Sequence, residues 1–277
     1  MQKRHTLRHL AWRSGVAAVS QAMMFTGLYP LLPHALRAVQ RAPEGAKAQP
    51  FTGSMRSALA EWGMSVALST VRPAGFLPLP GSRQVGPRPV IVLHGYAMNR
   101  ANFLPLAYRL SRAGLGPILG FEYWTLGRVV AAAKQLAWFV ELVQARTGSP
   151  QVDIIGHSMG GVVGRYYVTL LGGDGAVANL VTLGSPHSGT DVSRIGIGAP
   201  TRELIFGSKL VQRLAAAPPP RDTRVLTILS HADALVPASA QLALEIPRAE
   251  RIVYDDLGHV ALLGSRRVAN EIIRRLK

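Results

Sequence analysis

The sequence contains no cysteine. This absence excludes a disulfide framework, a thiol nucleophile and a cysteine-ligated zinc site, while it leaves the redox compartment open. Aspartates with the spacing of a calcium-binding loop are also missing, so we expect no bound metal. There is no repeat of fixed length, and 48% of the 277 residues are apolar, which is enough to bury the core of one main domain.

Acidic residues are few, since 15 Asp and Glu oppose 31 Lys and Arg and the formal net charge is +16. Such an excess favours polyanionic partners, namely nucleic acid, anionic lipid or an acidic surface. The basic residues are scattered singly or in short pairs, without zinc-finger spacing, an RNA-binding aromatic run or a basic zipper region. We therefore expect no nucleic-acid partner and interpret the charge as suited to an anionic membrane surface.

An apolar segment follows a basic N-terminus. Residues 1–13 carry four Lys or Arg and no acid, and residues 14–32 carry no charge. The apolar length approaches the roughly 20 residues of a membrane-spanning helix, although several polar residues and Pro30 weaken it. We expect an uncleaved anchor or interfacial helix here. A signal peptide and a buried helix of a soluble protein are the alternatives.

Residues 1–50 end in a polar linker, and a second segment, 51–86, follows. Within it, residues 55–71 repeat apolar side chains at helical spacing, and Pro73 begins a run of prolines that ends the pattern. We expect a helix that faces a membrane or packs on the rest of the protein.

Short apolar runs alternate with helical stretches over residues 87–277. The expected strands are 90–93, 117–123, 152–155, 180–183, 225–229 and 251–254, and the expected helices are 102–112, 129–145, 160–171 and 268–276. This alternation predicts an α/β fold with a mostly parallel sheet and helices on both faces. The strands are mostly apolar, as is typical of buried parallel strands.

The pentapeptide Gly156-His157-Ser158-Met159-Gly160 joins an expected strand to an expected helix. In this context the pattern Gly-x-Ser-x-Gly is typical of a sharp turn that exposes a serine hydroxyl above the sheet. The helix dipole then faces the oxyanion that forms on attack. The motif predicts that Ser158 is a nucleophile.

A serine nucleophile needs a base and an orienting carboxylate, which follow it in the order acid, then histidine, in this type of fold. Asp233 and His259 both follow expected strands and stand in that order. We predict that His259 is the base and Asp233 the acid. Asp191 is the competing acid.

Two backbone amides are predicted to form an oxyanion hole. Met159 follows the nucleophile, and Tyr96 lies in the loop after the first core strand. In that loop Gly95 lets the backbone approach the substrate. We also place His94 and His187 near the substrate, although an ordinary loop role is the simpler interpretation of both.

Five motifs resemble the bacterial lipase/esterase family of the α/β-hydrolase superfamily, and its small triacylglycerol lipases in particular. They are LHGYAMNRANF at 93–103, DIIGHSMGG at 153–161, LGSPHSGT at 183–190, DALVP at 233–237 and DLGHVALL at 256–263. The resemblance implies a reduced α/β-hydrolase fold whose sheet starts at the third strand of the full fold. It also implies ester hydrolysis through an acyl-enzyme, no cofactor, and a short cap or lid over residues 191–221.

We thus expect a serine hydrolase that cleaves carboxylic esters, especially those of lipids. An acyltransferase or a thioesterase with the same triad is the alternative, and a non-catalytic membrane-associated scaffold is a further one. The apolar segment 14–32 would attach such a bacterial protein to the inner membrane, whereas cleavage of a signal peptide would make it periplasmic or secreted.

Overall fold

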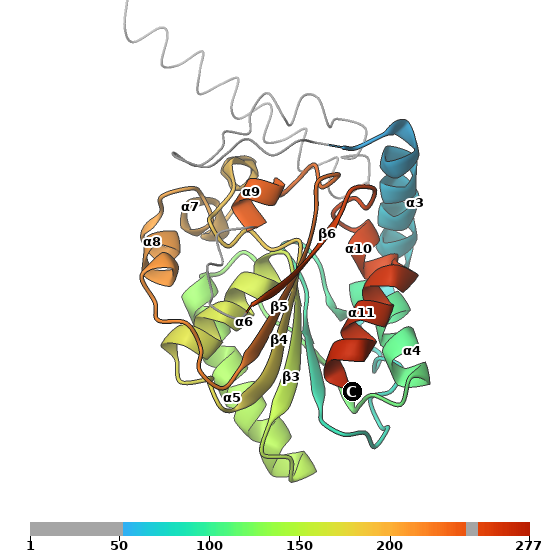
Figure 1. Cartoon of the computed structure of the whole chain (residues 1–277), viewed down its shortest axis with the longest axis vertical. Helices are drawn as coiled ribbons and strands as arrows, with labels where there is room; N and C mark the ends of the chain where they lie inside the picture. The colour runs from blue at the N-terminus through green and yellow to red at the C-terminus, as the bar shows by residue number, and fades with distance from the viewer. Residues whose placement is uncertain (1–51, 242–248) are drawn as a thin grey trace, which may run out of the picture.

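The computed structural model describes residues 52–241 and 249–277. Six strands form a sheet in the order β2-β1-β3-β4-β5-β6, and all neighbours are parallel (Figure 1). The strands are β1 (Val90–Leu93), β2 (Ile118–Phe121), β3 (Val152–His157), β4 (Val177–Leu183), β5 (Arg224–Ser230) and β6 (Glu250–Tyr254). The predicted parallel α/β sheet is confirmed, and its first described strand is the one expected at residue 90.

Helices connect the strands, because parallel neighbours require crossover connections. The α-helices are α3 (Met55–Val71), α4 (Leu104–Arg112), α5 (Val129–Thr147), α6 (Met159–Leu170), α7 (Pro200–Glu203), α8 (Lys209–Ala215), α9 (Ala238–Gln241), α10 (Ala261–Gly264) and α11 (Arg266–Leu276). Short 3-10 helices are η2 (Arg72–Phe76), η3 (Arg100–Phe103) and η4 (Asp191–Ile195).

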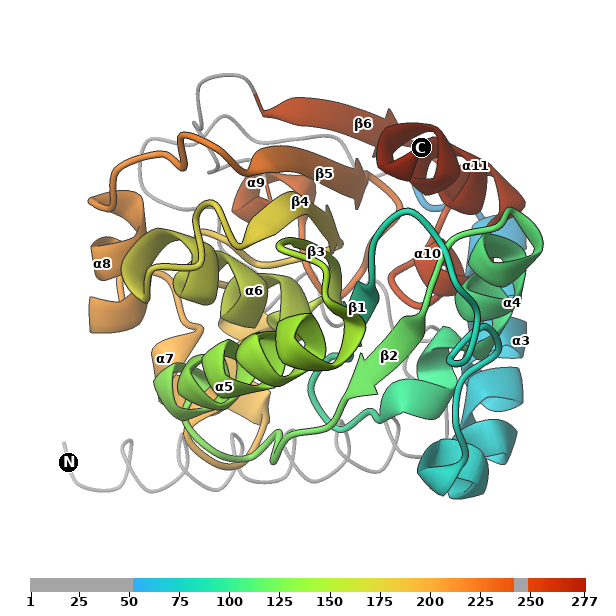
Figure 2. The ribbon, with the colours of Figure 1, turned by 90° about the horizontal axis from the view of Figure 1, so that it is seen from below.

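The sheet is covered on both faces. Alternate residues of β1 enter different cores, because successive side chains of a strand point to opposite faces. Val90 and Val92 pack in the core under α4 and α11, whereas Ile91 and Leu93 pack in the core under α5 and α6. Figure 2 shows these helix pairs on opposite sides of the sheet. Burial of each such side chain contributes roughly 1.5–3 kcal/mol, so the two cores hold the sheet rigidly.

Helix α3 has the bounds that the sequence predicts, but it packs on an unexpected face. A capping box of Ser54 and Ser57 starts the helix, and its buried side includes Ser57 and Glu61, while Leu59 and Trp62 are exposed. The helix lies beside α10 in both views (Figures 1 and 2). Its buried face is mainly polar towards the N-terminal end, where Glu61 accepts from backbone amides, and apolar further on, where Leu68 joins the core.

The predicted membrane segment, residues 14–32, lies outside the described residues. Within residues 52–241 and 249–277, none of the helices has both the length and the apolar character needed to span a membrane. Membrane association remains a prediction from the sequence.

The predicted cap, residues 191–221, contains η4, α7 and α8. Backbone contacts fasten it to the segment before α5, since Ala199 N donates to Leu126 O at 2.9 Å. Glu203 accepts from Val129 N at 2.7 Å and pairs with Arg128 at 3.0 Å. The cap is thereby held next to the start of α5.

Candidate active site

Ser158 lies at the turn between β3 and α6, as the pentapeptide predicts. Its φ of 54° and ψ of −125° lie in a region that L-residues rarely adopt. Its amide donates to Leu183 O at 2.8 Å, which fixes this backbone against β4. Strained conformations of this kind persist where the surrounding structure enforces them, and they cluster at functional sites.

Gly160 allows α6 to approach the end of β1. A Cβ atom at this position would lie 2.3 Å from Leu93 O and 2.7 Å from His94 O, and both are backbone atoms that cannot swing away. Packing around the turn therefore requires a glycine at position 160.

We expect Gly160→Ala to lower the free energy of unfolding by about 1–3 kcal/mol, because it overpacks a site walled by backbone. Gly63→Ala is the matched control. It adds the same methyl group on the exposed side of α3, where no atom lies within 4 Å of the new Cβ. That change should raise the free energy of unfolding by about 0.5–1 kcal/mol. Urea unfolding measures both, and equal stability of Gly160→Ala and the parent would contradict this packing.

Asp233 and His259 meet beyond the ends of β5 and β6. His259 Nδ1 lies 2.7 Å from Asp233 Oδ2, and both side chains are buried. The other carboxylate oxygen accepts from Leu235 N at 2.9 Å and Val236 N at 2.8 Å. These bonds fix the carboxylate, which in turn orients the imidazole.

His157 supports His259 from the strand side, a contact that the sequence does not reveal. Its ring centroid lies 4.6 Å from that of His259, and its Nε2 lies 3.0 Å from His259 O. The His157 ring is fully buried. Burial and the nearby His259 charge hold the pKa of His157 well below its usual value, so His157 stays neutral beside His259.

Burial and two neighbouring carboxylates set the charge of His259. Burial lowers its pKa, but the charge and hydrogen bond of Asp233, together with the charge of Glu61, outweigh burial and raise the pKa above 6.5. The imidazolium form is therefore favoured relative to a free histidine.

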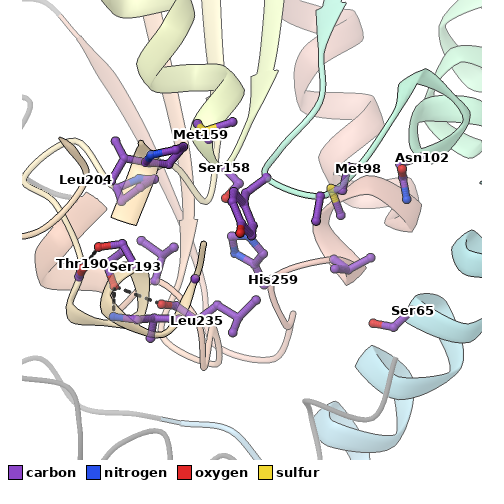
Figure 3. A pocket seen from close by; sticks show the side chains of 18 of the residues that line it. Ser65, Met98, Asn102, Ser158, Met159, Thr190, Ser193, Leu204, Leu235 and His259 are labelled. Carbon is purple, nitrogen blue, oxygen red and sulfur yellow. Dashed lines mark hydrogen bonds between the residues drawn. The ribbon is translucent and has the colours of Figure 1, made fainter. Parts of the chain in front are cut away.

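Ser158 and His259 line the same pocket (Figure 3). The cavity has a volume of about 130 Å³. Tyr96, Ala97 and Met159 also line it. Ser158 and Ala97 are the two non-glycine residues with a left-handed φ in the described ranges. Backbone strain is thus concentrated in the wall of this pocket.

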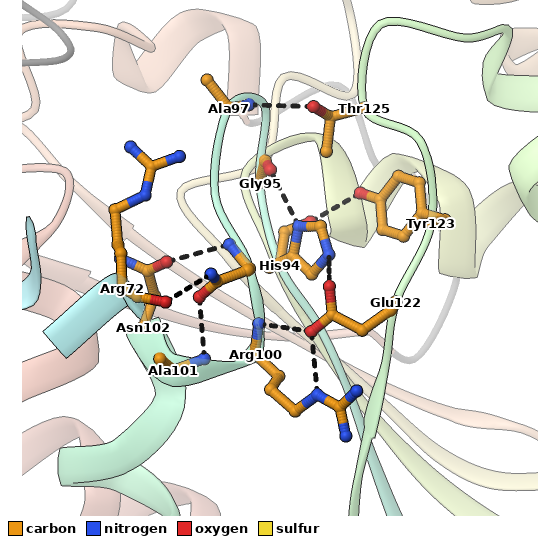
Figure 4. Close-up of polar contacts among 11 residues, drawn as sticks. Arg72, His94, Gly95, Ala97, Arg100, Ala101, Asn102, Glu122, Tyr123 and Thr125 are labelled. Atoms are coloured by element: carbon orange, nitrogen blue, oxygen red, sulfur yellow. Dashed lines mark hydrogen bonds and ion pairs between the residues drawn. The ribbon is translucent and has the colours of Figure 1, made fainter. Parts of the chain in front are cut away.

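Hydrogen bonds fix the loop after β1, which carries Tyr96 (Figure 4). His94 Nε2 lies 3.3 Å from Glu122 Oε2, and Tyr123 donates from its hydroxyl to His94 O at 2.5 Å. Ala97 N donates to Thr125 Oγ1 at 3.2 Å. The Tyr96 hydroxyl both donates to Ile197 O at 3.0 Å and accepts from Ile197 N at 2.9 Å, which ties the loop to the cap.

Several predicted residues do not reach the pocket. His94 is buried in the network of Figure 4, and His187 is buried with its Nε2 3.1 Å from Thr182 Oγ1. Neither lies among the lining residues, and nor does Gly95, whose added Cβ would meet Ser158 Cβ at 3.0 Å. Asp191, the competing acid, starts η4, whereas Asp233 makes the bond to His259.

Helix α3 forms part of the pocket wall, which the sequence does not predict. Ser65, Leu68 and Ser69 line the cavity from its C-terminal half, and Arg72, which follows the helix, lines it as well. Arg72 O also accepts from Asn99 Nδ2 at 2.9 Å and so joins the helix to the loop after β1. The one sequence feature that accompanies this packing is the recurrence of small polar residues, Ser57 and Ser65, along the buried face of the helix.

The described residues contain no group of three or more His, Asp or Glu side chains arranged to hold a metal ion.

Comparison with known proteins identifies the fold. A family model described as a PGAP1-like alpha/beta domain matches residues 128–195, a stretch that includes α5, β3, α6 and β4. The mature lipase BlEst2 of Bacillus licheniformis has a TM-score of 0.59 at 14% sequence identity, over 68% of this chain and 91% of that one. Such low identity supports a shared fold alone.

Sequence similarity to lipases covers a shorter stretch. Triacylglycerol lipases of Pseudarthrobacter phenanthrenivorans and Burkholderia plantarii are each 40% identical to this chain over 58 residues, which is 21% of it. The matched part spans 18% and 16% of those two lipases. The chain has the α/β-hydrolase fold and is related in sequence to triacylglycerol lipases, which confirms the predicted resemblance to lipases and esterases.

Proposed function

We propose that the protein is a serine hydrolase that cleaves carboxylic esters with Ser158, His259 and Asp233 as its triad. One observation carries the proposal most strongly: a histidine bonded to a buried carboxylate at 2.7 Å lines the same pocket as a serine held in a strained turn. This is the arrangement needed to activate a weakly acidic hydroxyl.

In the proposed reaction, His259 accepts the hydroxyl proton of Ser158 as Oγ attacks the ester carbonyl carbon. The same proton then passes to the leaving alcohol, and an acyl-enzyme remains. A water molecule, deprotonated by His259, attacks the acyl carbon; the bond from the acyl carbon to Ser158 Oγ then breaks, His259 returns the proton to Oγ, and the acid is released. Asp233 keeps the imidazole in the tautomer that accepts at Nε2 and stabilises its cationic form.

We assign the oxyanion hole to the backbone amides of Tyr96 and Met159. Met159 is the first residue of α6, so its N–H has no acceptor within the helix and the positive end of the helix dipole is close by. The bonds of the Tyr96 hydroxyl to Ile197 and of Ala97 N to Thr125 hold the opposite loop. Preorganised donors of this kind supply a large part of the rate in acyl transfer.

A lipid ester is the proposed substrate class. The pocket wall is rich in apolar side chains, among them Leu68, Met98, Val192, Leu204, Leu235 and Val236. Such a lining suits an acyl chain. The related triacylglycerol lipases are consistent with this class. We further propose that residues 191–221 act as the cap over the acyl chain.

Hydrolysis of a p-nitrophenyl ester series from acetyl to palmitoyl, together with phospholipids and an alcohol acceptor, tests the proposal. We expect ester cleavage that depends on Ser158 and is faster for esters with long acyl chains than for esters with short ones. Transfer of the acyl group to the alcohol in place of water would instead identify an acyltransferase. No cleavage of any ester by the folded parent would refute the hydrolase assignment.

The pH dependence of kcat/KM should reflect the raised pKa of His259. The neutral imidazole is the active form, so kcat/KM should rise with pH through an apparent pKa above 6.5. A stopped assay in constant-ionic-strength buffers from pH 5 to 9 measures this limb. An acid limb centred below pH 6.5 would show that burial lowers the pKa of His259 by more than Asp233 and Glu61 raise it.

We also propose attachment to an anionic membrane through residues 1–50. The support is the basic start of the chain and the uncharged segment 14–32. Flotation with vesicles containing phosphatidylglycerol, compared with neutral vesicles, provides the test. Equal recovery of the protein with both kinds of vesicle would show that anionic lipid is not required for attachment.

A further inference from the structure

Helix α3 brings a buried carboxylate to the loop that carries His259. Glu61 is 4% exposed. The backbone that its side chain contacts lies 199 residues further along the chain. Its Oε1 accepts from Val260 N at 2.7 Å, and its Oε2 accepts from Ala261 N at 2.7 Å. These two amides immediately follow His259 in the chain and lead into α10.

The fit around this carboxylate is tight. A Cβ atom at Gly258 would lie 2.5 Å from Glu61 Oε2, so the chain on the other side of His259 also lies against it. A carboxylate buried this deeply is stable only when charged or hydrogen-bonded partners surround it. Both neighbours of His259 in the chain are thus within contact distance of one side chain from α3.

Asp233 and Glu61 restrain His259 in different ways. Asp233 contacts the ring, whereas Glu61 contacts the backbone that follows it. A small movement of that backbone would carry the imidazole away from Ser158, and misplacement by about 1 Å costs as much as 10²-fold in rate. Glu61 is the one charged side chain among the buried residues described in α3, since the others are Ser57, Ser65 and Leu68.

We propose that Glu61 is a positioning residue of the active site, holding the His259 loop through the Val260 and Ala261 amides and adding negative charge beside the imidazole. The proposal rests on the proposed function of His259 as the base. It gives α3, which precedes the sheet in the chain, a part in positioning His259.

The charge of Glu61 predicts a pH effect as well. The charged and titratable groups facing His259 are Asp233 after β5, His157 from β3 and Glu61 from α3. Asp233 and Glu61 raise the pKa of His259, and His157 stays neutral. Removal of the Glu61 charge alone should therefore lower the pKa of His259 and move the acid limb of activity to lower pH.

Glu61→Gln keeps the length of the side chain but loses the charge and one acceptor. We expect kcat to fall roughly 10- to 100-fold with little change in KM, and the acid limb to shift to lower pH. Glu61→Asp keeps the charge but not the reach, so it should lose kcat while its acid limb stays closer to that of the parent. Labelling of Ser158 by a fluorophosphonate probe, followed from pH 5 to 9, provides the same comparison without an ester substrate.

Two controls separate positioning from simple stabilisation of α3. Ser54→Ala removes the N-cap of the same helix, so it should lower the melting temperature yet keep the parent pH profile. Glu141→Gln makes the same chemical change on the exposed side of α5 and should match the parent. Rates are normalised to the folded fraction measured by circular dichroism, and Glu61→Asp provides the test if Glu61→Gln does not fold.

Parent-like labelling rates and pH profile in Glu61→Gln would overturn the proposal. Equal losses in Ser54→Ala and Glu61→Gln at the same folded fraction would also overturn it, because they would indicate a structural role. If the folded parent itself is not labelled at Ser158, the proposed function fails, and the role of Glu61 fails with it. The two failures are thus distinguished by the parent protein.

Discussion

Ser158→Ala is expected to lower kcat for ester hydrolysis by about 10⁶-fold, leaving only the catalysis that the oxyanion donors and substrate binding provide. The reason is chemical, because Ala has no oxygen to form the acyl-enzyme and His259 is left without a proton to accept. The measurement is kcat with p-nitrophenyl butyrate, using stopped assays long enough to detect slow turnover.

The fold should survive this change. Ser158 has a positive φ that strains any side chain, and Ala has a Cβ in the same place as Ser, so the turn gains no new clash. Far-UV circular dichroism and the melting temperature should match those of the parent. Turnover by Ser158→Ala at more than about a hundredth of the parent rate would assign the activity to another group.

Asp233→Asn is expected to lower kcat by about 10⁴-fold. The amide of Asn donates a hydrogen bond where the carboxylate accepts one, so it favours the His259 tautomer that cannot take the Ser158 proton. The fold should persist, because the Asn carbonyl can still accept from Leu235 N and Val236 N, as Asp233 Oδ1 does. Steady-state kinetics at a pH above the acid limb measures the loss.

Asp256→Asn is the matched control for this change. Asp256 lies three residues before His259 but pairs with Arg267 at 2.6 Å on the surface. Its replacement should change kcat by less than about twofold, since exposed ion pairs contribute little. Loss of activity in Asp256→Asn together with parent-like activity in Asp233→Asn would transfer the role of the acid to Asp256.

The sheet and the pentapeptide turn are predictable because their signals are local. Residues 90–93 are a continuous apolar run, and residues 152–155 are apolar except for Asp153, as expected of strands that are buried on both faces. Ser158 is identifiable because its motif stands between a strand and a helix. Asp233 and His259 are identifiable because they follow strands, and strands of a parallel sheet end at one edge.

The packing of α3 is not predictable from the same kind of signal. Periodicity places Leu59 and Trp62 on a face that an amphipathic helix would normally bury, but both are exposed. Glu61 is buried because its partners are the Val260 and Ala261 amides, about 200 residues away in the sequence. A contact made by backbone groups leaves no pattern of residue types, so only the three-dimensional structure reveals it.

The two histidines predicted to lie near the substrate, His94 and His187, also could not be placed from the sequence. His94 stands next to the oxyanion loop in sequence, but its ring stacks on Tyr123 and meets Glu122. His187 belongs to the motif 183–190, but burial and the charge of Arg165 hold its pKa well below the usual value. Proximity in sequence to a motif therefore does not separate a residue that contacts substrate from one that holds the loop.

Mass spectrometry of peptides from the protein after reaction with a fluorophosphonate tests directly whether Ser158 is the nucleophile. We expect one phosphonyl adduct, on Ser158, formed in the parent and absent from Ser158→Ala and, at short times, from His259→Ala. An adduct on a different residue, or equal labelling of Ser158→Ala, would contradict it.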